Sequence, residues 1–133
     1  MKKIGIIGAM AQEVERLKGR MEARRTLSKA SMEFLEGTLN GTEAVIVQSG
    51  IGKVNAAICA QILCDLFAVT HIINTGVAGS LKNEINIGDI VVSTDALHHD
   101  MDARVVGVKL GEVPQAGCLA FPADPHLQGL AVT

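Results

Sequence analysis

Short apolar runs alternate along the chain with longer stretches of mixed polarity. The runs at 3–8 and 71–73 are too short for helices, and their scarcity of polar positions predicts strands buried on both faces. Two further runs, 32–39 and 43–48, flank Asn40-Gly41, a dipeptide typical of the tight turn of a β-hairpin. The pattern therefore predicts buried strands at 3–8 and 71–73 and a hairpin at 32–48.

Helical periodicity appears in two of the longer stretches. From about Ala11 to Glu22 an apolar stripe recurs at helical spacing, with charges around it, which predicts an amphipathic helix whose charged face is solvated. The stripe consists of Met10, Val14, Leu17 and Met21, and the charges are Arg16, Lys18, Arg20, Arg24 and Arg25 interleaved with Glu13, Glu15 and Glu22. A second helix, from about Val54 to Phe67, is apolar on most sides and should be well buried.

The later part of the chain has a weaker pattern. Residues 85–94 predict one more strand after a turn, whereas the glycines and prolines from His98 onward indicate loop. Strands and helices thus alternate in an order typical of the α/β class, with a mixed central sheet flanked by helices. A length of 133 residues suits a single α/β domain over 1–133.

Composition narrows the possible functions. The net charge is −2 and aromatic residues make up only 2%, so the chain has neither the basic surface nor the stacking side chains of a nucleic-acid-binding protein. No apolar run approaches the length of a membrane span. The cysteines, Cys59, Cys64 and Cys118, lack metal-type spacing, and the first two suit small core fillers in a reduced, cytoplasmic setting.

Loops that contain glycine follow three of the predicted strands, at 8–11, 49–53 and 76–80. If those strands are parallel neighbours, the loops share one edge of the sheet and can form one pocket, since ligands in open α/β sheets bind beyond the carboxyl ends of strands. Each loop alone is equally consistent with a tight turn. The dinucleotide fingerprint is excluded by Asn55, and the P-loop motif by Val47 and Val54.

Glu13 is the candidate reactive group. It lies in the first turn of the predicted helix, beside the apolar stripe, which directs its carboxylate toward the edge of the expected pocket. The alternative is that it only complements the helix dipole, as acidic residues in first turns often do. Of the remaining polar residues, the run from His98 to Asp102 suits a structural role better than a metal site, and no nucleophile–base–orienter set can be assembled.

Four motifs, in this order, resemble those of the 5′-methylthioadenosine/S-adenosylhomocysteine nucleosidases, a family of the nucleoside phosphorylase/nucleosidase superfamily. The resemblance runs through essentially the whole chain, and the four motifs together are specific. They are Gly5-Ile-Ile-Gly-Ala-Met-Ala-Gln-Glu-Val14, Ser49-Gly-Ile-Gly-Lys-Val54, Asn74-Thr-Gly-Val-Ala-Gly79 and Gly88-Asp-Ile-Val-Val-Ser93.

This resemblance implies a three-layer α/β/α fold and hydrolysis of the bond between adenine and ribose, without a metal or organic cofactor. It assigns to Glu13 the activation of the attacking water. Family positions that line the nucleoside site fall on Met10, Ile51, Val77, Ala78 and Gly79. Family positions that reach across a homodimer to cover the 5′-alkylthio group fall on Ala103, Val106 and Pro114.

The chain departs from the family pattern in three respects. Val106 and Val108 stand where aromatic residues are usual, and Ser80 stands where glycine is common. Family members also continue well past Thr133, with further strands and helices. That part carries the ribose-binding glutamate, the aspartate that protonates adenine and a stacking phenylalanine, so the expectation is that residues 1–133 alone are inactive.

Two alternatives stay open. One is a purine nucleoside phosphorylase of the same fold, although phosphate binding typically uses arginine and the predicted pocket loops contain none. The other is a truncated, non-catalytic remnant that only binds ligand or dimerises.

Overall fold

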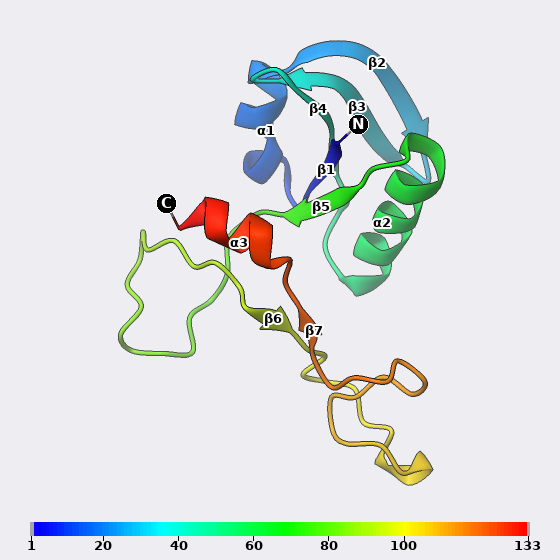
Figure 1. The fold of residues 1–133 in the computed structure, drawn as a ribbon, viewed down its shortest axis with the longest axis vertical. Helices are drawn as coiled ribbons and strands as arrows, with labels where there is room; N and C mark the ends of the chain where they lie inside the picture. Colours follow the sequence, from blue (N-terminus) through cyan, green and yellow to red (C-terminus); the bar gives the residue numbers. More distant parts are fainter. Residues whose placement is uncertain (1, 133) are drawn as a thin grey trace. The chain divides into compact units, whose positions relative to one another are not determined.

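The computed structural model describes residues 2–132. These residues fall into two compact units, one up to Gly79 and one from Ser80 onward, which are described separately (Figure 1). The single domain predicted over residues 1–133 stays a prediction.

The first unit is built on a five-stranded mixed sheet in the order β2-β3-β4-β1-β5. Its middle strand, β4, pairs parallel with β1 and antiparallel with β3, and β1 pairs parallel with β5. The strands are β1 Lys3–Gly8, β2 Glu22–Lys29, β3 Met32–Leu39, β4 Thr42–Gln48 and β5 His71–Asn74.

Two helices cover opposite faces of this sheet (Figure 1): α1, Ala11–Arg20, and α2, Lys53–Phe67. Successive residues of a strand point to opposite faces. Accordingly, Ile6 packs in the cluster around Val14 of α1, whereas Ile7 packs in the cluster around Leu63 of α2. The predicted three-layer α/β/α arrangement is therefore confirmed in this unit.

The local predictions for β1 and the hairpin are confirmed. Strands β3 and β4 meet at Asn40 and Gly41, whose φ angles of 49° and 77° are the left-handed values that this turn requires. Glycine and asparagine adopt such angles at little cost, which explains why the dipeptide predicted the turn correctly.

The helix predicted from Ala11 to Glu22 ends two residues early, at Arg20, and the strand that follows was missed. Glu22–Lys29 forms β2, an edge strand that pairs with β3 and exposes every residue but Leu27 to solvent to a large extent. The charges of Arg24 and Arg25 belong to this strand and not to the predicted helix face. Charged side chains on an edge strand oppose pairing with other chains, so their presence there has a physical reason.

Burial was overestimated at three places. Helix α2 buries only the face that carries Cys59, Leu63 and Phe67, and Val54 is 74% exposed. Cys64 is exposed rather than a core filler, although Cys59 is buried as expected. Strand β5 is not buried on both faces, because it is the edge strand of the described sheet and Ile72 and Ile73 are each 36% exposed.

The second unit has little regular structure. It contains a two-stranded ladder, a 3₁₀ turn and a short helix, namely β6 Asp95–Ala96 with β7 Phe121–Pro122, η1 Arg104–Val106 and α3 Pro125–Ala131. The strand predicted at 85–94 is wrong for this structure, because no strand among the described residues pairs with it and Ile87 and Ile90 remain exposed. The loop predicted from His98 onward is confirmed apart from these short elements.

Helices of the described residues are all too short or too polar to cross a lipid bilayer.

Candidate functional site

The three predicted loops meet at one edge of the sheet. Strands β4, β1 and β5 are parallel neighbours, so the segments that leave them all start at the same end. The Ser49 amide donates a hydrogen bond to the Gly8 carbonyl (2.9 Å), and the Thr75 amide donates to the Ile7 carbonyl (2.9 Å). The sheet thus brings residues 8–11, 49–53 and 75–79 together. The sequence predicted this meeting for loops 8–11, 49–53 and 76–80, and of these residues Ser80 belongs to the second unit.

The Glu13 side chain connects the first and third of these loops. Glu13 is the third residue of α1 and is partly buried. Its Oε2 accepts a hydrogen bond from the Met10 amide (2.9 Å), and its Oε1 accepts one from the Val77 amide (3.0 Å). The first bond caps the start of the helix, while the second reaches a residue far away in the sequence. Glu13 therefore has a local helix-capping role and, in addition, a position at the edge of the sheet.

Backbone amides keep the Glu13 carboxylate ionised. The pKa of Glu13 is lowered, first by the hydrogen bond from the Val77 amide and then by that from the Met10 amide; partial burial opposes the shift. The Ala9 amide also lowers the pKa of Glu13. A carboxylate has about four acceptor positions, so these three amides still leave room for a water molecule. A lowered pKa favours the ionised carboxylate at neutral pH, and its negative charge suits stabilisation of a positive charge that develops nearby.

Ser49 is a site residue that the sequence predictions missed. It is the only buried polar residue in the part of the chain that the structure describes, at 5% exposure. Its hydroxyl donates to the Gly50 carbonyl (2.9 Å), and its amide bonds Gly8, so it anchors the second loop to the first. The available signal was a serine directly after an apolar strand and before Gly50-Ile51-Gly52.

The predicted substrate-binding residues have different surroundings. Met10 and Val77 are brought together by their hydrogen bonds to Glu13. The Ile51 side chain is 74% exposed, and the Ile51 carbonyl accepts a hydrogen bond from the Asn55 amide group (2.8 Å). Ala78 and Gly79 are exposed and follow Val77 directly. These residues therefore border an open edge rather than an enclosed chamber.

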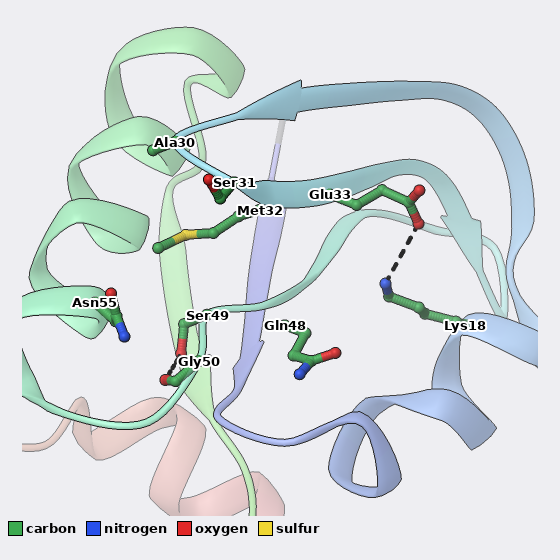
Figure 2. A pocket seen from close by; sticks show the side chains of 9 residues that line it. All are labelled: Lys18, Ala30, Ser31, Met32, Glu33, Gln48, Ser49, Gly50 and Asn55. Atoms are coloured by element: carbon green, nitrogen blue, oxygen red, sulfur yellow. Dashed lines mark hydrogen bonds and ion pairs between the residues drawn. The ribbon is translucent and has the colours of Figure 1, made fainter.

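A cavity of about 500 Å³ lies beside this edge (Figure 2). Of the three loops it involves only the second, through Ser49 and Gly50, so it is not the pocket that the three loops were expected to form. Its cation, Lys18, lies 3.6 Å from the Glu33 carboxylate. The lining residues are Lys18, Ala30, Ser31, Met32, Glu33, Gln48, Ser49, Gly50 and Asn55.

The residues predicted to lie across a dimer belong to the second unit. Ala103 precedes η1, and its carbonyl accepts a hydrogen bond from the Val106 amide (3.0 Å) at the end of that turn. Val106 is 66% exposed, and Pro114 is exposed in the following loop.

Comparison with known proteins assigns the chain to a family. The model of the phosphorylase superfamily matches residues 3–133. The chain belongs to the phosphorylase superfamily.

Two curated relatives are 5′-methylthioadenosine/S-adenosylhomocysteine nucleosidases. The chain is 48% identical, over 98% of its length, to a 5′-methylthioadenosine/S-adenosylhomocysteine nucleosidase of Chromohalobacter salexigens, of which it covers 55%. It is also 48% identical, over 93% of its length, to the nucleosidase of Halalkalibacterium halodurans, of which it covers 54%. The chain thus spans about half the length of the curated relatives it matches.

Two solved structures of nucleosidases match nearly the whole chain. A nucleosidase of Colwellia psychrerythraea in complex with adenine matches with a TM-score of 0.93 and 42% identity, over 98% of this chain and 54% of that one. The Neisseria meningitidis nucleosidase in complex with methylthio-immucillin-A matches with a TM-score of 0.94 and 39% identity, over 99% and 57%.

Other titratable side chains, among them Asp102 and Cys59, have surroundings typical of a structural role. The Asp102 carboxylate accepts hydrogen bonds from Nε (2.9 Å) and Nη2 (2.7 Å) of Arg104, which lower its pKa. Burial raises the pKa of Cys59 to about 11, so this thiol stays protonated. Nowhere in residues 2–132 do three His, Cys, Asp or Glu side chains gather in a way that could hold a metal ion.

We predict that Glu13 makes stability depend on pH in an identifiable way. Because its pKa is lower in the folded state, the ionised carboxylate stabilises the fold above the unfolded-state pKa, and this contribution is lost as pH falls through the folded-state pKa. Glu13→Gln should therefore unfold at lower urea concentration than the wild type near neutral pH. The difference should shrink as pH falls below about 4.3, the ordinary pKa of glutamate. A difference that is the same at every pH would contradict this prediction.

Proposed function

We propose that this chain belongs to an enzyme that hydrolyses the N-glycosidic bond of 5′-methylthioadenosine and S-adenosylhomocysteine, releasing adenine and the 5-thioribose product. The observation that carries the proposal is the ionised Glu13 carboxylate at the edge where the three loops meet. The names of the relatives and the adenine and methylthio-immucillin-A complexes of two similar structures support the choice of substrate.

The chemistry assigned to Glu13 follows from its charge and position. In the proposed reaction the bond between the anomeric carbon and adenine breaks, positive charge develops on the sugar, and water adds to that carbon. A fixed carboxylate stabilises this charge and accepts a hydrogen bond from the water, whose proton it takes as the new C–O bond forms. Met10, Ile51, Val77, Ala78 and Gly79 would line the nucleoside site around it.

Protonation of the leaving adenine belongs to another residue. Adenine is a poor leaving group until it is protonated, and the family resemblance assigns this step to an aspartate with no counterpart among the residues of this chain. Activity is therefore expected of a form, here called the full-length form, that contains this chain and reaches the length of the curated relatives.

A phosphorylase reaction is the second candidate, and the described loops disfavour it. Phosphate in place of water would require cationic partners, typically arginine. The loops 8–11, 49–53 and 75–79 contain no arginine. Arg24 and Arg25 lie on β2, where they pair with Glu43 and Glu36.

We further propose that the full-length form is a cytoplasmic homodimer. The family resemblance places Ala103, Val106 and Pro114 at positions that cover the 5′-alkylthio group of a partner's substrate. The exposure of Val106 and Pro114 leaves them available for such a contact.

The reaction type is tested by product analysis. The full-length form should release adenine from methylthioadenosine at the same rate with and without phosphate, because water is the proposed acceptor. The measurement is adenine release followed by chromatography in phosphate-free buffer. Turnover that requires phosphate and yields a sugar 1-phosphate would favour the phosphorylase instead.

The role of Glu13 is tested by substitution. Glu13→Gln in the full-length form should keep the fold and lower kcat by at least about 10²-fold, the low end for loss of a catalytic acid or base. Glu15→Gln is the matched control, because Glu15 lies on the same helix and is exposed. If Glu13→Gln had wild-type kcat, Glu13 would have only its helix-capping role.

The dimer is tested by sedimentation. The full-length form should sediment as a dimer at micromolar concentration, and Val106→Glu should shift it toward the monomer, since a charge would be placed twice in a two-fold contact. Exclusive monomer in the wild type would refute the proposed assembly.

A further inference from the structure

The backbone at Gly76 lies so close to the Glu13 carboxylate that any side chain at this position would collide with it. A Cβ atom at Gly76 would lie 2.4 Å from Oε1 and 2.7 Å from Cδ of Glu13, well inside van der Waals contact. The backbone of the third loop can therefore approach the carboxylate only because position 76 has no side chain.

The conformation of Gly76 does not itself require glycine. Its φ lies outside the left-handed region, and the residue is exposed, so alanine could adopt the same backbone. The atoms in the way of a methyl group are the end of the flexible Glu13 side chain. A substitution at Gly76 should therefore displace the carboxylate and leave the fold intact.

Other glycines of the site are different. At Gly8 a Cβ would lie 2.6 Å from Cγ1 of Val14, which is only 1% exposed and belongs to the core. A side chain at Gly8 would thus disturb packing as well as Glu13. Gly76 is the position where the placement of Glu13 can be changed separately.

We propose that Gly76 is a positioning residue, which acts through Glu13 by leaving the space in which the carboxylate accepts the hydrogen bond of the Val77 amide. The catalytic consequence rests on the hydrolytic function proposed above. The geometric part of the inference, that the carboxylate depends on the empty space at Gly76, concerns the first unit alone.

A double-mutant cycle in the full-length form tests the catalytic part. Gly76→Ala should lower kcat for methylthioadenosine at least about 10-fold, with a smaller change in KM, because Glu13 acts on the water. In the Glu13→Gln background the same substitution should cost less than about 2-fold. Gly19→Ala is the matched control, because a Cβ there meets no atom within 4 Å.

Rescue by a shorter side chain separates positioning from general damage. Aspartate at position 13 would retract the carboxylate and leave room for the methyl group, so Gly76→Ala should not lower the kcat of Glu13→Asp further. If Gly76→Ala lowers kcat by the same factor in the Glu13→Gln and Glu13→Asp backgrounds as in the wild type, Gly76 acts independently of Glu13 and the inference is overturned. Wild-type kcat in Gly76→Ala overturns it as well.

Amide hydrogen exchange tests the geometric part without reference to activity. The Val77 amide should exchange at least about 10-fold faster in Gly76→Ala, as in Glu13→Ala, because its charged acceptor is lost. It should exchange at the wild-type rate in Gly19→Ala. If the enzyme proves inactive but Val77 exchange rises, the proposed function fails and the positioning stands; unchanged exchange in Gly76→Ala refutes the positioning.

Discussion

The pair of backbone hydrogen bonds to the Glu13 carboxylate is the interaction on which the candidate site depends. Glu13 lies in the first turn of α1, yet its Oε1 accepts a hydrogen bond from the Val77 amide, 64 positions away in the chain. The same two amides that hold the carboxylate also lower its pKa, so position and charge have one cause. Without this contact Glu13 would cap a helix and nothing more.

The sheet makes that contact possible. Because β4, β1 and β5 are parallel, the residues after them emerge at one edge, and the Ser49 amide fixes the second loop on the Gly8 carbonyl. Core residues on both faces of β1 and β4 hold these strands in place, with α1 and α2 as outer layers. Adjacent parallel strands in a sheet that helices cover on both faces are a common foundation for sites assembled from loops. The site is thus a consequence of strand order as much as of any single motif.

Sequence patterns predicted what is local and missed what depends on distant partners. The Asn40-Gly41 turn and the amphipathic start of α1 follow from backbone preferences and spacing, and both were predicted correctly. The charges of Arg24 and Arg25 suit a solvated helix as well as an edge strand, and only pairing with β3 decides between them. Residues 85–94 have the composition of a strand but no neighbour here to pair with. The contact of Glu13 with Val77, and the space that Gly76 leaves for it, require the register of β1 and β5, which no pattern along the chain specifies.

The most direct test of the central claim is a crystal structure of the full-length form with a non-hydrolysable nucleoside analogue. The account predicts that the Glu13 carboxylate still accepts hydrogen bonds from the Met10 and Val77 amides. It also predicts an ordered water within hydrogen-bond distance of that carboxylate, facing the anomeric carbon of the analogue. A Glu13 side chain turned toward solvent, with no water between it and the sugar, would contradict the account.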